Sequence, residues 1–340
     1  MFVMRQANYA KWAFALLLLV LLSNFMVYRS PFSAAVIPDD TFWLVAGSLF
    51  DFAIVVPLLL LASFRLNAKQ LIGFIAAGLI TARLIIPALY FEPFALLFYF
   101  GVAIEVLVLV AELALLALLL IHIPGIRRSM AEQAGSPLFT LFPAVHRKIK
   151  PNPFINVLLS EALAFYYAFF TWKKQPIDDP AAITLHKNTS SIAFNIMLIH
   201  AIVIETIGIH WWFHDKSAVL SLVLLALNVY SVIYFIGDIQ ATRLNPLTVK
   251  NENLHVSLGL NKRISVPIDS IKAVRWGATP EADALAFVAK DFEEPHPEVV
   301  IDFKSPQQAV LFFGKTRAVS QIALKVDEPE KLKQLLSSIK

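Results

Sequence analysis

The chain has 340 residues, of which 58% are hydrophobic and 16% are charged, and its mean hydropathy is +0.66. Soluble domains contain roughly 45–50% apolar residues, so water is not the main solvent of this chain. The formal net charge of +4 is too small and too evenly spread for a nucleic-acid-binding protein. The absence of cysteine excludes disulfides, thiolate metal sites and cysteine nucleophiles.

Seven hydrophobic runs are candidates for membrane-spanning helices. Crossing a hydrocarbon layer of roughly 30 Å takes about 20 mostly apolar residues. The runs are Trp12–Tyr28, Thr41–Ser63, Gln70–Tyr90, Ala95–His122, Phe154–Trp172, Ile192–Phe213 and Ala218–Asp238. The first run is longer than a signal-peptide core of about 7–15 residues, and further runs follow it, so we expect an uncleaved helix. Gly73 and Gly78 give the third run a small-residue face suited to close helix packing.

Positively charged residues predict the orientation of these runs, because positive flanking residues tend to stay in the cytoplasm. Arg5 and Lys11 place the N-terminus there, and four crossings later the chain returns at the basic stretch Arg127–Lys150. A crossing by the fifth run, Phe154–Trp172, would export two lysines and the C-terminal part. Six crossings therefore fit the charges better than seven, with the fifth run re-entrant, interfacial or packed within the bundle. We expect a multi-pass protein of the cytoplasmic membrane with its N-terminus and C-terminal domain in the cytoplasm.

After Arg243 the pattern changes to short alternating segments rich in Val, Ile and Phe, which predicts β-strands. The segments are Leu247–Lys250, Leu254–Leu258, Arg263–Pro267, Ile271–Trp276, Ala284–Ala289, Val299–Phe303, Ala309–Phe313 and Ser320–Val326. A final helix is predicted over Asp327–Ile339. Asp327 and Glu330 have the spacing of a capping box, and the apolar residues from Leu332 to Ile339 form a helical stripe.

Two domains follow from this change of pattern: an α-helical transmembrane bundle of six or seven hydrophobic helices over residues 1–242, and a small soluble β domain over residues 243–340. The opening LTVKNENLHVSLGLNKRISVPIDSIKAV and the ending VDEPEKLKQLLSSIK of the second domain resemble bacterial pleckstrin-homology-like (PH-like) domains attached to membrane helices. The resemblance implies a partly open barrel of seven or eight strands with one C-terminal helix, and it assigns no catalytic residue. The stretches SLFDFAIVVPLLLLAS and EALAFYYAFFTW resemble uncharacterised multi-spanning bacterial membrane proteins.

A domain of this kind suits a protein partner or a lipid head group beneath the bilayer. Head-group pockets usually need a dense basic cluster, which would form if Lys262, Arg263 and Lys272 converged. Because the domain is not dense in basic residues, we favour an interaction or assembly module over a head-group pocket.

Five ionisable residues within the hydrophobic runs form a predicted intramembrane charge cluster: Asp51, Arg83, Glu105, Glu112 and Glu205. Such groups cost about 2.5–3.5 kcal/mol each on insertion scales, so each needs a partner or a function. Asp51 and Arg83 lie roughly 18–20 Å from the cytoplasmic ends of adjacent helices, which predicts an ion pair. Glu105 and Glu112 share a helix face. The structural interpretation is stabilisation of the bundle, and the functional one is a charge relay or ion path that includes Glu205.

A histidine-rich stretch, HAIVIETIGIHWWFH, is the most suggestive candidate for chemistry. On a continuous helix His200, His210 and His214 fall on one face, and the i, i+4 spacing of the last two lets them reach one divalent metal ion. Glu161 or His186 would complete the site from elsewhere in the chain. No HExxH motif is present, so we favour hydrogen-bonded interfacial histidines over metal ligands.

Three functional interpretations remain open. The first is a non-enzymatic sensor, scaffold or regulator with a cytoplasmic PH-like interaction domain, favoured because no P-loop, GxGxxG, GxSxG or metalloprotease motif is present. The second is a membrane-embedded metal-dependent enzyme that acts on a lipid or another apolar substrate through the histidine face. The third is a proton-coupled transporter that uses the intramembrane charges, which would need visible repeat symmetry.

Overall fold

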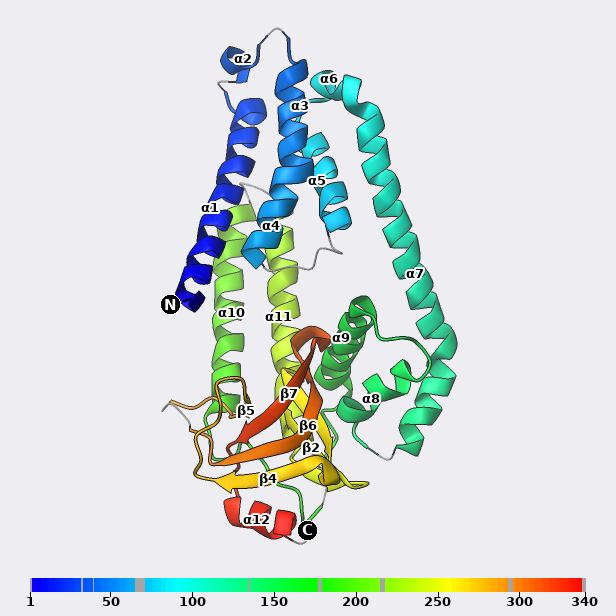
Figure 1. Cartoon of the computed structure of the whole chain (residues 1–340), viewed down its shortest axis with the longest axis vertical. Coiled ribbons are helices and arrows are strands. Elements are labelled where there is room, and N and C mark those ends of the chain that lie inside the picture. The colour runs from blue at the N-terminus through cyan, green and yellow to red at the C-terminus, as the bar shows by residue number, and fades with distance from the viewer. Residues whose placement is uncertain are drawn as a thin grey trace. The chain divides into compact units, whose positions relative to one another are not determined.

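A computed structural model describes residues 2–31, 33–38, 40–64, 71–133, 135–176, 179–214, 218–292 and 296–337 (Figure 1). Contacts divide the chain into two compact units, Met1–Leu115 and Leu116–Lys340, and the division falls within helix α7 (Ala95–Glu132). The boundary predicted at residue 243 separates helices from strands, and its status as a domain boundary stays a prediction.

The first unit is built from helices that share one apolar core. Its elements are α1 (Phe2–Arg29), α2 (Ser33–Val36), α3 (Phe42–Phe50), the π-helical η1 (Asp51–Val55), α4 (Val56–Phe64), α5 (Leu71–Ile85), α6 (Ala88–Phe91), η3 (Glu92–Phe94) and the start of α7. Leu17, Phe52 and Leu79 lie in this core. Gly78 lets α5 approach η1 closely, because an added Cβ would overlap the carbonyl oxygen of Phe52, as its predicted packing role requires. A Cβ added to Gly73 would meet no described atom within 4 Å, so Gly73 does not share that role.

Among the described residues, six helical stretches are long and apolar enough to cross a membrane. They are Ala10–Arg29, Phe42–Phe64, Val106–Glu132, Pro153–Phe170, Ser191–Trp212 and Ser221–Leu244. The described part of the third predicted run forms a shorter apolar helix, Gly73–Ile85, and Gln70 lies outside the described residues. The fifth run forms a helix of 18 residues, so its length does not single it out as the run that fails to cross. These helices are compatible with a multi-pass membrane protein.

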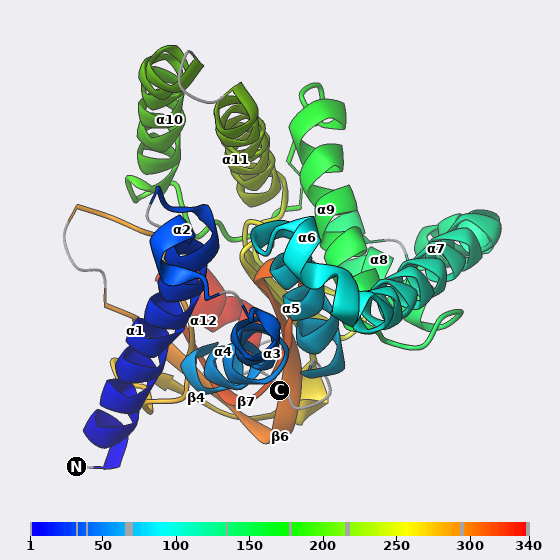
Figure 2. The same cartoon turned by 90° about the horizontal axis from the view of Figure 1, so that it is seen from above.

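The second unit contains helices α8 (Pro137–His146), α9 (Pro153–Phe170), α10 (Ser191–His214) and α11 (Ala218–Leu244). Two of them begin with a capping residue followed by proline, a combination that satisfies free N–H groups at a helix start. Ser136 Oγ accepts the Leu138 N–H at the start of α8, and Asn152 Oδ1 accepts the Phe154 N–H at 2.8 Å at the start of α9. Helix α11 packs against both α9 and α10, so the three lie side by side (Figure 2).

The described C-terminal residues form a mixed sheet of seven strands that is curled into a half-barrel (Figure 1). The strands are β1 (Thr248–Lys250), β2 (Asn253–Leu258), β3 (Lys262–Pro267), β4 (Ile271–Trp276), β5 (Leu285–Phe287), β6 (Val299–Leu311) and β7 (Thr316–Leu324). Their order is β1-β2-β3-β6-β7-β5, and β4 also pairs with β6. Strand β5 is parallel to β7, whereas the other pairs are antiparallel.

The long strand β6 produces the curl. Val299–Phe303 and Ala309–Phe313, predicted as two strands, belong largely to this single strand. Its register with β7 shifts between Asp302 and Gln307, an irregularity that bends a strand. The first half of β6 pairs with β4 and the second half with β3. Eight predicted segments therefore become seven strands, and the half-barrel agrees with the predicted partly open barrel.

Helix α12 (Pro329–Ser337) packs on the half-barrel at the C-terminal end of the chain. Leu332 and Leu336 are buried in the half-barrel core, as the predicted helical stripe requires. Ile339, the last residue of that stripe, lies outside the described residues.

The segment between α9 and α10 also belongs to the half-barrel. Ile183 forms an isolated β-bridge with Leu247 and lies in the half-barrel core. The carboxylate of Asp327 accepts the backbone N–H groups of Lys187 at 2.9 Å and Asn188 at 3.0 Å. Helix α12 begins at Pro329, and the Leu332 N–H bonds to the Glu328 carbonyl, so Glu328 holds the N-cap position and the capping role predicted for Asp327 is wrong.

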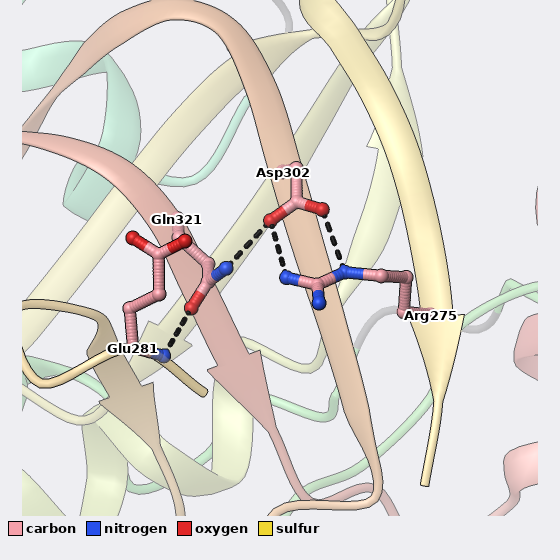
Figure 3. Close-up of polar contacts among 4 residues, drawn as sticks. All are labelled: Arg275, Glu281, Asp302 and Gln321. Atoms are coloured by element: carbon pink, nitrogen blue, oxygen red, sulfur yellow. Dashed lines mark hydrogen bonds and ion pairs between the residues drawn. The ribbon is translucent and has the colours of Figure 1, made fainter. Parts of the chain in front are cut away.

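A polar cluster links β4, β6, β7 and the turn before β5 (Figure 3). Arg275 donates to both carboxylate oxygens of Asp302, from Nε at 2.8 Å and from Nη2 at 3.0 Å. Gln321 donates to Asp302 at 2.6 Å and accepts the backbone N–H of Glu281 at 2.8 Å. The Arg275 hydrogen bonds hold the pKa of Asp302 below its usual range. This cluster fixes the register of neighbouring strands.

Candidate functional site

The junction between α11 and the half-barrel centres on one buried carboxylate. Asp238, in the last two turns of α11, is 6% exposed. Its Oδ1 accepts the backbone N–H of Leu260 at 2.8 Å and the side-chain amide of Asn261 at 3.2 Å. Its Oδ2 accepts the side-chain amide of Asn195, from α10, at 3.1 Å. One side chain thus joins two helices to the turn between β2 and β3.

The turn between β2 and β3 has the backbone that this contact requires. Gly259 has a φ of +58°, in the left-handed region that favours glycine. A Cβ at this position would overlap the Asp238 carboxylate and lie 2.7 Å from Thr242 Oγ1. Only a residue without a side chain lets the turn present the Leu260 N–H to the carboxylate.

A second buried network lies where α11 ends. The Asn245 side-chain amide donates to Tyr167 Oη on α9 at 3.1 Å, and the Asn245 side-chain oxygen accepts a hydrogen bond from the Ser136 hydroxyl at the start of α8. The Asn245 backbone oxygen accepts the Ser257 hydroxyl on β2 at 3.0 Å. Only Asn245, Pro246 and Leu247 separate α11 from β1. The half-barrel is therefore fixed to three helices of its own unit by hydrogen bonds, without a flexible linker.

A cavity of about 600 Å³ opens beside Asp238, between α10, α11 and the half-barrel. Tyr230, Tyr234 and Phe312 contribute aromatic surface, and Lys262 and Lys290 contribute positive charge. Burial lowers the pKa of Lys262. An apolar wall with lysines at one side suits a ligand that has an apolar body and an anionic group.

The predicted cluster of intramembrane charges is divided between the two units. Asp51 begins η1, and its carboxylate accepts the side-chain amide of Asn24 at 2.9 Å. Arg83 lies in the last turn of α5 and is partly exposed. The Asp51–Arg83 ion pair stays a prediction.

The three predicted glutamates lie on α7 and α10. Glu112 is partly buried on α7, and Glu205 is exposed on α10. Glu105 also lies in α7, but its side chain is outside the described part of the structure. The relay that would include these residues therefore stays a prediction.

Three of the predicted metal ligands, His200, His210 and Glu161, have separate hydrogen-bond partners. His200 Nδ1 lies 2.8 Å from the Ile196 carbonyl of its own helix, and His210 Nδ1 lies 2.7 Å from the Ser221 hydroxyl of α11. Both oxygens of Glu161 accept the Tyr230 hydroxyl, at 2.8 and 2.9 Å.

His186 lies in the segment that connects α9 to α10 and is buried, and this burial lowers its pKa. Within the described residues, no group of three or more His, Asp or Glu side chains is arranged to hold a metal ion. The side chain of His214 lies outside the described part, so metal binding stays a prediction.

The residues that form the junction were not singled out in the sequence. In the sequence Asp238 ends the last hydrophobic run, and a lone carboxylate in an otherwise apolar helix is the signal that marks it. Lys262, Arg263 and Lys272 do not converge: Lys262 lines the cavity beside Asp238, Arg263 lines a different one, and Lys272 is exposed.

Comparison of the chain with protein-family models, with curated proteins and with solved structures finds no match.

Proposed function

We propose that the protein is a non-enzymatic sensor, scaffold or regulator of the cytoplasmic membrane, and that its half-barrel is a PH-like binding module on the cytoplasmic side. The observation that carries this proposal is the Asp238 carboxylate, which joins α10, α11 and the β2–β3 turn through three hydrogen bonds. A ligand that moves the β2–β3 turn would also displace the Asp238 carboxylate, and with it the contact between α10 and α11.

The short connection to the sheet supports the same role. Domains joined by exposed linkers move independently by default, so binding to one has little effect on the other. Here the end of α11 is hydrogen-bonded through Asn245 to α8, α9 and β2. If a ligand binds one position of the half-barrel more tightly than another, it stabilises that position, and the helices attached to the half-barrel move with it. This coupling is what a sensor requires.

The other two interpretations have less support. A metal-dependent enzyme needs at least three ligands around one point, whereas His200, His210 and Glu161 are hydrogen-bonded to a carbonyl and two hydroxyls. A proton-coupled transporter needs the intramembrane charges to line one path, whereas the described hydrogen bond of Asp51 is to Asn24, which is not ionisable.

Single cysteines test the placement of the half-barrel, because the natural chain contains none. The variants are Asp40→Cys, Lys174→Cys and Lys304→Cys, at exposed positions, labelled by a membrane-impermeant maleimide in intact and in lysed cells. We expect Cys at position 40 to react in intact cells, and Cys at positions 174 and 304 to react only after lysis. Labelling of position 304 in intact cells would place the half-barrel outside and overturn the proposal.

A further inference from the structure

A second cavity, of about 470 Å³, lies between α8 and strands β3 and β6 of the same unit. Its walls are mainly apolar, with Leu138, Phe142 and Val310 among them. Arg263 contributes a positive charge to this lining. The cavity is separate from the one beside Asp238.

Strand geometry explains why an arginine faces this cavity. Side chains alternate between the two faces of a strand, and Ile264 and Val266 of β3 point into the half-barrel core. Arg263 and Ser265 therefore lie on the opposite face, which α8 covers. This places a cation between the sheet and a helix.

The Arg263 guanidinium is buried without an anionic partner among the described residues. The residue is 4% exposed, and its Nη2 has no hydrogen-bond acceptor. Its Cζ lies 4.4 Å from the centre of the Phe142 ring, so one face is stacked on an aromatic surface. Burial lowers the pKa of Arg263 to about 10, which leaves the group charged at neutral pH. A buried charge is costly unless it is paired, so the arrangement lacks a partner that carries negative charge.

The surroundings define the chemistry of that partner. A single guanidinium matches a single negative charge, and it binds phosphate oxygens through two parallel N–H groups. Ser265, Gln308 and Thr316 add hydroxyl and amide donors for further oxygens of the same group. The apolar walls suit a hydrocarbon chain attached to it.

The place of α8 in the chain puts it beside the end of a candidate membrane span. This short apolar helix lies in the chain between the candidate spans Val106–Glu132 and Pro153–Phe170. Because α8 follows the span Val106–Glu132, it begins beside the end of that span, at the boundary where phosphate groups of lipids are found.

We propose that this cavity binds the monoanionic phosphate of a phospholipid, with the phosphate oxygens on the Arg263 guanidinium and acyl carbons along Leu138 and Val310. The inference rests on the proposed role of the half-barrel as a binding module and names its ligand. Inorganic phosphate shares the recognised chemistry, so the test separates the two sources.

The experiment uses the full chain, purified in detergent, and native mass spectrometry with thermal unfolding as a second readout. The probes are phosphatidylglycerol, diacylglycerol with the same acyl chains, and inorganic phosphate. We expect phosphatidylglycerol to bind and to raise the unfolding temperature, while the other two do neither. Arg263→Met should weaken phosphatidylglycerol binding by at least about tenfold, because it removes a charge-assisted pair.

Two further variants make the test specific. Arg317→Met removes an exposed arginine of the same sheet and should leave lipid binding unchanged. Val310→Trp fills the cavity while keeping Arg263, and it should also abolish binding, which covers the case that Arg263→Met fails to fold.

Equal binding of phosphatidylglycerol and diacylglycerol, unchanged binding in both Arg263→Met and Val310→Trp, or stabilisation by inorganic phosphate alone would overturn the proposal. None of these results depends on the side of the membrane that the cysteine labelling reports, so the two proposals fail separately.

Discussion

The backbone N–H of Leu260 donates a hydrogen bond of 2.8 Å to the carboxylate of Asp238, across 22 residues of sequence. This contact brings the turn between β2 and β3 against the last two turns of α11. Here the half-barrel and a candidate membrane span share a buried polar group, and the first two predictions begin from this contact.

Asp238→Ala should destabilise the second unit by about 2–4 kcal/mol. The substitution leaves the Leu260 N–H and the amides of Asn195 and Asn261 without their acceptor, and a buried unsatisfied donor costs about 1–3 kcal/mol. Unfolding of the purified chain in detergent measures the loss. Asp269→Ala, which removes an exposed carboxylate in the turn between β3 and β4, should change stability by less than about 0.5 kcal/mol. Equal effects of the two substitutions would contradict a structural role for Asp238.

Gly259→Ala should destabilise the chain more than Gly277→Ala does. Both glycines have a positive φ, +58° and +65°, so both substitutions carry a backbone penalty of roughly 1–2 kcal/mol. Only the Cβ at position 259 would also overlap Asp238, whereas at position 277 no described atom lies within 4 Å. The difference between the two unfolding free energies isolates the close contact, and a difference near zero would mean that the turn does not touch α11.

The Arg275–Asp302 pair predicts a specific pH dependence. The hydrogen bonds from Arg275 hold the pKa of Asp302 below the usual value of about 3.9, so their stabilisation is fully present above that pH and is lost as the pH falls through the lowered pKa. Asp302→Asn should therefore be destabilising at pH 7 and become progressively closer to the parent below about pH 4. Parallel unfolding series at several pH values measure this convergence. A constant difference at all pH values would show that the charge of Asp302 does not contribute.

Metal analysis separates the proposed function from the enzyme alternative. The non-enzymatic proposal predicts that the purified chain holds no stoichiometric divalent metal, with or without His210→Ala plus His214→Ala. The histidines then act through hydrogen bonds such as the one between His210 and Ser221. Stoichiometric metal in the parent that disappears in the double variant would favour a membrane-embedded enzyme instead.

Local patterns in the sequence predicted most of the secondary structure. The hydrophobic runs became helices because a span needs a long apolar stretch whatever its neighbours are. Ile271–Trp276 was predicted with the bounds of β4, because its alternation is complete within the segment. Strand β6 was predicted as two pieces because its polar centre, from Lys304 to Gln308, interrupts the alternation that marks a half-buried strand.

The site depended on contacts that no local pattern contains. Asp327 looked like a helix cap by spacing, but the N–H groups of Lys187 and Asn188, from another part of the chain, take its oxygens. The sequence places Arg263 beside Lys262 in a possible basic cluster, whereas in the structure Arg263 faces α8 and Lys262 lines the other cavity. Both outcomes depend on which distant residues pack against the segment, which neither propensity nor spacing encodes.

The measurement that tests the account most directly is the distance between the half-barrel and α11 in lipid nanodiscs. Spin labels on Val229→Cys and Lys304→Cys, both at exposed positions, report it by pulsed electron paramagnetic resonance. We expect one narrow distance distribution, which Asp238→Ala broadens and the control Asp269→Ala leaves unchanged. A broad distribution in the parent, or an equally narrow one after Asp238→Ala, would contradict the claim that this carboxylate fixes the half-barrel to the helices.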